Sequence, residues 1–347
     1  MSREGSTGRL LQLCTGYFTF YVLYGVAVKY LRGPLGMDGI AVLTFTTLGG
    51  VGIVFPIVVA RKWYRLHSNA SVTKFGLTFP SEYLYIIPSG ICTAIVIPTT
   101  TLMYTLPITV MVAMTIMRAS IIIISRLVDA IQIRQGLLDK RVYKEENIAI
   151  VLALGAVGVH LYFGAKENSG FDFLHNTAAL VILGCYITFY AIRIYLMNYF
   201  KNTRAAGVKL DNQGFFAIEQ FAAMAAMAVI AGSLLLIAGD GPRMTLFRAA
   251  ISAPPTTWHW GIIAGAPFGL AAFFSVFIYM FKGRTATFAG LVNRLTSLVA
   301  GTVATLLFWL VFDGTPPETQ DWLALGFIVL AVYFLTAAER RRAAELP

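Results

Sequence analysis

Long apolar runs separated by short polar segments dominate this chain. A helix rises about 1.5 Å per residue, so about 20 apolar residues are needed to cross a hydrocarbon layer of about 30 Å. The strict alternation of polar and apolar residues that is typical of membrane β-barrels does not occur in these runs. The pattern predicts an all-α polytopic membrane protein, one transmembrane domain over residues 1–347. Its ten predicted helices cover residues 10–31, 39–60, 82–104, 107–129, 147–164, 176–199, 214–238, 258–281, 286–312 and 321–338.

Composition agrees with this class. The chain is 57% hydrophobic and 13% charged, whereas soluble proteins average about 25% charged residues, so an ordinary soluble enzyme is excluded. The sequence contains no phosphate-binding loop, dinucleotide fingerprint, zinc motif or nucleophile elbow, and it therefore predicts no cofactor, no metal and no enzymatic activity. Cys14, Cys92 and Cys185 all fall inside predicted helices, which favours small buried apolar residues over a disulfide framework.

The basic residues predict the orientation. With the N-terminus in the cytoplasm, the predicted inside segments contain 18 of the 27 Lys and Arg residues, and the outside segments contain 4. Such an imbalance is the positive-inside pattern, and an even number of helices then places both termini in the cytoplasm. Because the membrane explains the basic charge, nucleic acid is not an expected partner.

The two halves of the chain share short motifs in the same order. Four of five residues are identical between residues 17–21 and 186–190. Two weaker matches pair residues 88–90 with 267–269 and residues 117–120 with 293–296. Five helices per half is an odd number, so the second half must have the inverted topology. The sequence predicts a five-helix repeat over 10–164 and an inverted five-helix repeat over 176–338, an arrangement typical of alternating-access transporters.

Five basic residues lie inside the predicted helices. Placing a guanidinium at the bilayer centre costs at least about 2.5 kcal/mol, so intramembrane charges usually face a cavity and are functional. Arg126 lies one turn from a helix end and can extend to the headgroups. Arg118 and Arg294 occupy equivalent, deeper positions of the two repeats. We therefore predict that these two arginines line a substrate site.

Lys29 and Arg193 are further candidates for substrate binding, although each is close enough to a helix end for anchoring at the interface to compete. Glu219 is the acidic residue within a predicted helix that could serve as a coupling group or as an ion-pair partner. Since one carboxylate cannot neutralise several cations, the cavity is expected to attract an anion, for which the planar arginine fork is suited.

Aromatic and amide residues complete the predicted site. Tyr21 and Tyr190 occupy equivalent positions of the shared motif, and Asn293 precedes Arg294 in another. The tyrosines could stack on a base or sugar ring, but a tyrosine stripe is also typical of helix packing and of membrane interfaces.

The predicted architecture resembles the drug/metabolite transporter superfamily over essentially the whole chain. Four segments are similar to the helix 4 to 5 and helix 9 to 10 regions of nucleotide-sugar transporters, namely residues 117–120, 140–146, 293–297 and 316–322. The resemblance implies that Arg118 and Arg294 contact nucleotide phosphates. The chain departs from the family in lacking the Asn-rich motifs of GDP-mannose transporters and the Lys-Arg doublet of plastid phosphate translocators, so the resemblance assigns neither substrate.

Together these features predict a secondary transporter that moves an anionic, phosphorylated metabolite by alternating access. The metabolite would be a nucleotide sugar or a related compound, and exchange is one possible mode of transport. The alternatives are an amino-acid or drug exporter and a lipid-headgroup flippase. Expected partners are the metabolite and membrane lipids, with a homodimer possible through the glycines of residues 49–52. The bacterial inner membrane is the expected location, and the Golgi or another organelle membrane is the alternative.

Overall fold

The fold is taken from a computed structural model of the chain. It describes residues 6–74, 76–104, 110–139, 142–167, 176–237, 239, 241–314 and 316–345.

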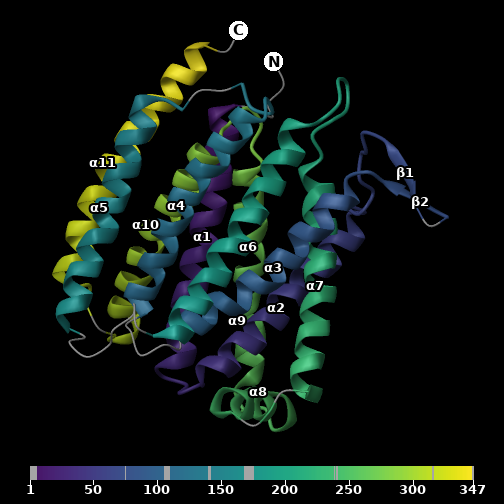
Figure 1. The fold of residues 1–347 in the computed structure, drawn as a ribbon. Helices are drawn as coiled ribbons and strands as arrows, with labels where there is room; N and C mark the ends of the chain where they lie inside the picture. Colours follow the sequence, from purple (N-terminus) through teal and green to yellow (C-terminus); the bar gives the residue numbers. More distant parts are fainter. Residues whose placement is uncertain are drawn as a thin grey trace.

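Helices account for nearly all regular structure in the described residues (Figure 1). Each of the ten apolar runs forms a long helix, although the start of the run at 107–129 falls partly outside the described residues. The helices are α1 (Thr7–Arg32), α2 (Gly39–Ala60), α3 (Tyr83–Tyr104), α4 (Val110–Arg134), α5 (Lys144–Glu167), α6 (Thr177–Asn202), α7 (Asn212–Ile237), α8 (Pro242–Ser252), α9 (Trp258–Tyr279), α10 (Ala286–Phe312) and α11 (Thr319–Glu345).

Polar side chains fix several helix starts. Asp38, Asn176 and Thr285 are N-cap residues of α2, α6 and α10, and the side chain of each accepts a hydrogen bond from a backbone N–H in the first turn. Such caps satisfy donors that have no partner within the helix. The polar residues between the apolar runs therefore set where these helices begin.

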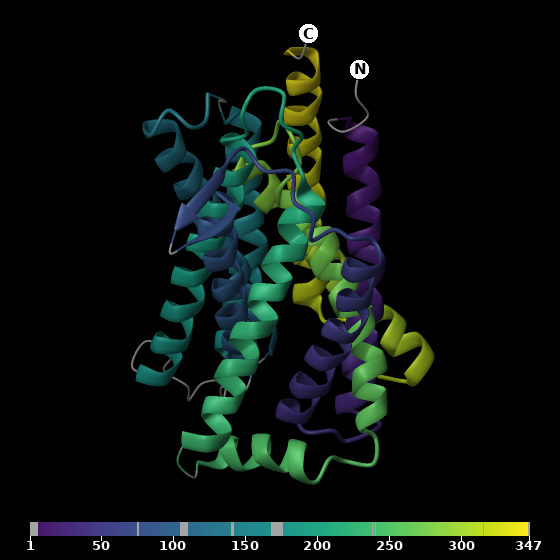
Figure 2. The same cartoon turned by 90° about the vertical axis from the view of Figure 1, so that its right-hand side faces the viewer.

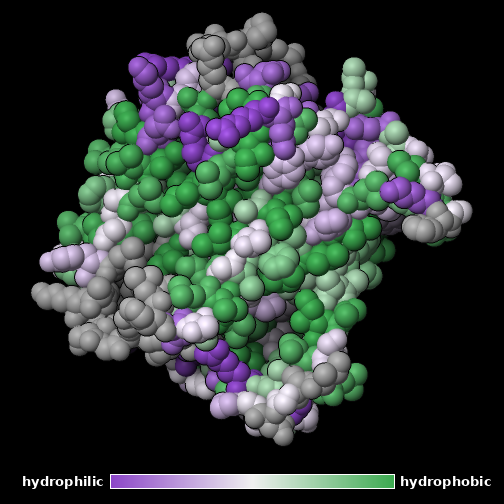
Figure 3. Space-filling model, viewed as in Figure 1, coloured by the Kyte–Doolittle hydropathy of each residue, from purple (hydrophilic) through white to green (hydrophobic). Residues whose placement is uncertain are grey.

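Eight helices are long and apolar enough to cross a membrane, namely α1, α2, α3, α6, α7, α9, α10 and α11. Parts of α4 and α5 lie outside the residues whose side chains are described. On the face shown in Figure 3, a broad hydrophobic band lies between two more hydrophilic ends. The protein is an all-α polytopic integral membrane protein, as the hydrophobic pattern predicts.

Two elements are not predicted by the apolar pattern. The short helix α8 lies across the end of the molecule opposite the termini (Figures 1 and 2). A small antiparallel hairpin of β1 (Ser71–Lys74) and β2 (Leu77–Pro80) projects from the end that carries the termini (Figure 1). Both are short and polar or only weakly apolar, so the search for long apolar runs could not detect them.

The long helices form two mixed bundles. In bundle A, α1 packs against α9 and α10, and α2 packs against α9; in bundle B, α3 packs against α6 and α7. Helix α4 lies between the bundles, because it packs against α6 and equally against α10. Figure 2 shows α1 and α2 on one side and α6 and α7 on the other. The peripheral helices α5 and α11 pack against each other. Each bundle therefore combines helices from both halves of the sequence.

Glycines in the matched motifs permit the closest contacts within the bundles. A Cβ atom at Gly90 of α3 would lie 2.5 Å from the carbonyl oxygen of Glu219 on α7. A Cβ atom at Gly269 of α9 would lie 2.6 Å from the carbonyl oxygen of Gly50 on α2. Both distances are shorter than a carbon–oxygen contact allows, so the absence of a side chain lets each pair of backbones approach. The motifs at 88–90 and 267–269 thus perform the same packing task in the two bundles.

The bundles meet closely at the end of the molecule that carries the termini. Phe216 of α7 packs edge-on against Phe273 of α9, with ring centroids 5.4 Å apart, and Trp63 stacks on Phe273 at 5.5 Å. Asp129 of α4 accepts hydrogen bonds of 2.7 Å from the first two N–H groups of α10. Lys201 of α6 donates to two carbonyl oxygens of bundle A and its connecting loop, at 2.9 and 3.0 Å. These contacts close this end.

Polar loops add a further contact at the same end. Glu82, directly before α3, accepts hydrogen bonds from Ser68, from the backbone N–H of Asn69 and from Arg204. Burial alone would raise the pKa of the Glu82 carboxyl, but these donors, together with the backbone N–H of Glu82 itself, outweigh it and hold that pKa below its usual value. The loop between α2 and α3 is thereby tied to the loop between α6 and α7.

Candidate functional site

A cavity of about 250 Å³ lies between the two bundles. Residues from α1, α2, α3, α4, α6, α7, α9 and α10 line it. Most come from the middle of the helices, and Leu43 of α2 and Thr100 of α3 extend the lining toward the end opposite the termini. Its wall includes Arg118, Arg193 and Arg294. The structure therefore brings three of the predicted intramembrane cations to one place.

Arg193 has a full partner in the cavity wall. Its Nε and Nη2 atoms donate to the two carboxylate oxygens of Glu219 at 2.9 and 3.0 Å, the bidentate geometry that arginine and carboxylate favour. Glu219 is completely buried, and it also accepts hydrogen bonds from Ser89 at 2.6 Å and from Thr93 at 3.4 Å. All four residues belong to bundle B. Of the two roles predicted for Glu219, the structure shows the ion pair.

Arg118 and Arg294 differ from Arg193, because no carboxylate within the described ranges forms an ion pair with either of them. Arg118 is buried, and its Nη2 atom lies 3.4 Å from the hydroxyl of Tyr21 and 3.5 Å from the carbonyl oxygen of Ser297. Arg294 donates to the hydroxyl of Tyr190, whereas its buried Nε has no hydrogen-bond partner. Among the described residues, neither guanidinium thus has a compensating carboxylate.

Tyrosines form an aromatic lining around these charges. Tyr17, Tyr21 and Tyr24 on α1 and Tyr186 and Tyr190 on α6 all face the cavity. The ring centroids of Tyr17 and Tyr21 are 5.5 Å apart, and those of Tyr186 and Tyr190 are 5.4 Å apart. The guanidinium carbon of Arg294 lies 5.1 Å from the centroid of the Tyr190 ring, within range of a cation–π interaction. Of the two interpretations of the tyrosine stripe, these positions favour a cavity lining.

Two predicted site residues lie outside this lining. Lys29, near the end of α1 away from the termini, donates to Thr305 of α10 at 2.8 Å and does not line the cavity. Asn293 is completely buried behind the cavity wall, where it donates to Ser275 of α9 at 2.9 Å. Asn293 is therefore placed to hold Ser275, which does line the cavity.

Ser89, Thr93 and Ser297 are polar contacts of the site that the sequence did not single out. Ser89 lies within the repeated motif at 88–90, where Gly90 brings α3 against the backbone of α7 beside Glu219. That motif was the available signal. The contribution of Ser297 is a backbone carbonyl, which every residue carries, so its side-chain type gives no signal.

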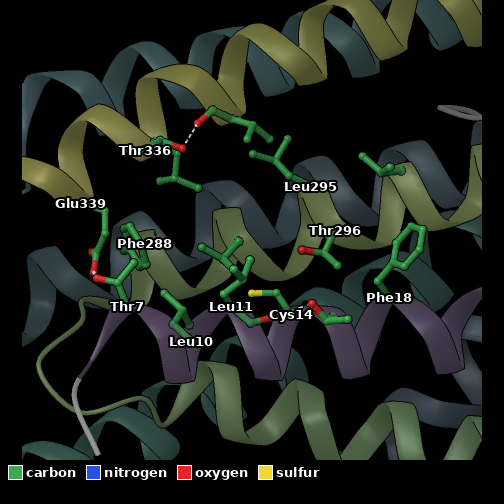
Figure 4. A pocket seen from close by; sticks show the side chains of 15 residues that line it. Thr7, Leu10, Leu11, Cys14, Phe18, Phe288, Leu295, Thr296, Thr336 and Glu339 are labelled. Carbon is green, nitrogen blue, oxygen red and sulfur yellow. Dashed lines mark hydrogen bonds between the residues drawn. The ribbon is translucent and has the colours of Figure 1, made fainter. Parts of the chain in front are cut away.

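A second hollow, of about 400 Å³, lies beside α1, α10 and α11 (Figure 4). Apolar residues such as Leu10, Leu11 and Leu295 dominate its lining. At one end Thr7 donates to Glu339 at 3.1 Å, and no basic residue lines the hollow. The larger hollow therefore lacks the groups that would bind an anion.

The fold and the central cavity together define a helical integral membrane protein with a charged cavity between two bundles. No family model and no curated protein matches the chain. Sixteen chains of known structure are similar to it. One of them, from a crystal structure, superposes with a TM-score of 0.60 at 14% sequence identity, over 97% of this chain and 99% of that chain. This similarity extends over the whole fold.

Proposed function

We propose that the protein is a secondary transporter that moves an anionic, phosphorylated metabolite across a membrane by alternating access. The observation that carries this proposal is the pair of guanidiniums, Arg118 and Arg294, that face the cavity without a carboxylate partner. Intramembrane arginines are costly unless paired or used, and their planar forks suit phosphate oxygens. The substrate would then supply the missing negative charge.

The contrast between the two ends of the bundles supports alternating access. The contacts of Phe216, Asp129 and Lys201 close the end with the termini, whereas the cavity lining extends toward the other end. With both termini in the cytoplasm, as the basic loops predict, this is the state closed to the cytoplasm. Rocking of bundle A against bundle B would close the other end and open this one.

Two repeated contacts support an inverted repeat. Arg118 and Tyr21 of the first half contact each other, as do Arg294 and Tyr190 at the matched positions of the second half. Gly90 and Gly269, also at matched positions, mediate equivalent close contacts. These correspondences favour the drug/metabolite transporter architecture that the sequence resembles, with nucleotide sugars among the substrates to test.

The proposal is tested by thermal shift and by counterflow in proteoliposomes. The ligand panel contains nucleotide sugars, nucleoside monophosphates, sugar phosphates, phospholipid headgroups and amino acids. A ligand at 100 times its dissociation constant stabilises by about 2.7 kcal/mol, which a melting curve detects. We expect one phosphorylated class to stabilise the protein and to exchange across the vesicle membrane, and we expect Arg118→Gln and Arg294→Gln to lose both effects.

Arg126→Gln is the matched control. It removes the same charge from the same helix as Arg118, but Arg126 does not line the cavity, so its response to ligand should be retained. If only amino acids or other neutral solutes stabilise the protein, and Arg118→Gln responds equally, the chain is an exporter of another class. A response to phospholipid headgroups alone would favour a flippase.

A further inference from the structure

The two arginines without carboxylate partners connect the two bundles. Arg118 lies on α4, which packs against α6 of bundle B and equally against α10 of bundle A, and it contacts Tyr21 and the Ser297 carbonyl of bundle A. Arg294 belongs to bundle A, and its contact with Tyr190 reaches into bundle B. The Arg193–Glu219 pair, by contrast, stays within bundle B. The polar contacts between bundles in the cavity wall are thus made by the same groups that would bind an anion.

We propose that Tyr21 and Tyr190 form a latch: they hold Arg118 and Arg294 across the bundle interface while the cavity is empty, and a bound anion displaces them. This inference rests on the proposed anion transport, and it adds a means by which binding controls the movement of the bundles. The phenols are positioning residues for the arginines, and the transported anion competes with them.

A phosphoryl group binds a guanidinium more strongly than a phenol does, so a bound anion displaces the phenol. A phenol offers a guanidinium one neutral oxygen, whereas a phosphoryl group offers several charged oxygens and a bidentate geometry. Hydrogen bonds to charged acceptors are stronger than those to neutral ones, so the anion takes the guanidinium from the phenol. Losing both phenol contacts removes the link between α6 and α10 made by Tyr190 and the link between α1 and α4 made by Tyr21. The phenol contacts therefore restrain the empty protein in this closed arrangement, and in the loaded protein the anion replaces them as the partner of both arginines.

The latch also changes the conformational equilibrium of the protein. A ligand changes a conformational equilibrium only if it interacts differently with the two states. Here the latch stabilises the empty closed state, and this stabilisation disappears when an anion occupies the arginines. Net movement of the empty carrier is then slow relative to exchange, which links the latch to an exchange mechanism.

Distance measurements between spin labels test the latch without any ligand. Labels are placed at Ala206, in the loop after α6, and at Lys282, in the loop after α9, both exposed at the end with the termini. The native cysteines, Cys14, Cys92 and Cys185, are first replaced by serine. We expect the Tyr21→Phe/Tyr190→Phe variant, without ligand, to gain a population with a longer distance that the unsubstituted protein lacks.

Tyr195→Phe is the matched control. Tyr195 lies on α6, as Tyr190 does, but its hydroxyl donates at 2.8 Å to Gln135, just beyond the end of α4, a helix that packs directly against α6. The control loses a tyrosine hydrogen bond without losing a link between bundles, so its distance distribution should not change. An unchanged distribution in the double variant, or an equal change in Tyr195→Phe, would overturn the latch.

A binding measurement with inorganic pyrophosphate separates the latch from direct recognition. Because the competing phenols are gone, we expect the double phenylalanine variant to bind pyrophosphate about 2- to 10-fold more tightly than the unsubstituted protein. Weaker binding by this variant would show that the phenols are ligands, which contradicts the latch. Failure of the unsubstituted protein to bind any member of the anion panel would instead contradict the proposed function, and the distance measurement distinguishes the two failures.

Discussion

Buried arginines have different partners in the two walls of the central cavity. In the wall formed by α3, α6 and α7, Arg193 is matched by Glu219, and that carboxylate is satisfied further by two hydroxyls. In the wall formed by α1, α4 and α10, the hydrogen-bond partners of Arg118 and Arg294 among the described residues are neutral oxygens. The first wall is electrically neutral, and the second carries two positive charges.

The depth of an arginine within the membrane therefore does not by itself identify it as a substrate-binding residue. Arg193 lies as deep in the protein as Arg118, and both are buried. The charge of a buried arginine is neutralised by a bidentate carboxylate. A buried arginine that is hydrogen-bonded to a phenol keeps its charge, so an anion that enters the cavity binds it favourably. Arg193 is therefore better understood as a structural element of the cavity wall, with Arg118 and Arg294 as the groups that we propose bind the substrate.

The largest expected effect comes from breaking the neutral wall. Glu219→Gln leaves the Arg193 charge buried without a partner, and breaking a buried pair in this way costs about 3 to 5 kcal/mol. We expect a pronounced fall in melting temperature in detergent. The double variant Arg193→Met/Glu219→Met removes both charges and should recover most of the loss. A Glu219→Gln protein as stable as the original would mean that the pair contributes little to the wall.

A smaller effect on stability, and a larger one on binding, is expected in the charged wall. Arg294→Gln removes a charge that has no carboxylate partner, so the melting temperature of the empty protein should change less than in Glu219→Gln. Each charge-assisted hydrogen bond is worth about 1.5 to 3 kcal/mol, which corresponds to an approximately 10- to 100-fold loss of affinity for the anion. Melting curves with and without the anion measure both quantities. Equal destabilisation by the two variants would remove the distinction between the walls.

A third, more modest effect concerns the loop contact outside the membrane-spanning helices. The pKa of Glu82 is lowered in the folded protein, so its contribution to stability is present above the usual carboxyl pKa, about 4.3, and is lost as the pH falls below it. We expect the melting temperature to fall between about pH 5 and pH 3, and to fall less in Glu82→Gln. Identical pH profiles for the two proteins would show that other carboxyls control this acid response.

The smallest effect is expected at Lys29. Its ammonium donates to Thr305 and lies 5.9 Å from the centroid of the Phe308 ring, outside the cavity lining. Lys29→Met should therefore change anion affinity less than about twofold, since screened charges at a distance contribute little. Titration of the anion against both proteins measures this. A tenfold loss would restore Lys29 to the substrate site and would extend the charged wall toward the end of α1.

The hydrophobic pattern predicts the helices closely because membrane burial depends on local composition. The runs at 39–60 and 286–312 coincide with α2 and α10 residue for residue, and the run at 10–31 is extended by a few residues in α1. Helix ends are set by local caps such as Asp38 and Thr285, so they too are visible in sequence. The short α8 was missed because its eleven residues carry no long apolar run.

The cavity could be predicted only in part. Depth and repeat position were enough to select Arg118 and Arg294, because the cost of burying a charge is a property of the residue and its place in the helix. The partner of each charge was not predictable in the same way. Arg193 and Glu219 are 26 residues apart, and Ser89 is 130 residues from Glu219, so only the packing of α3, α6 and α7 brings them together.

The sequence by itself determined that this is a helical membrane protein and which arginines lie deep within it, since both follow from the cost of exposing polar groups to hydrocarbon. Only the tertiary structure decided which arginines keep a free charge. Ion pairing depends on atoms being within a few ångströms of each other, and long-range packing of the two bundles places Glu219 beside Arg193 and phenols beside Arg118 and Arg294.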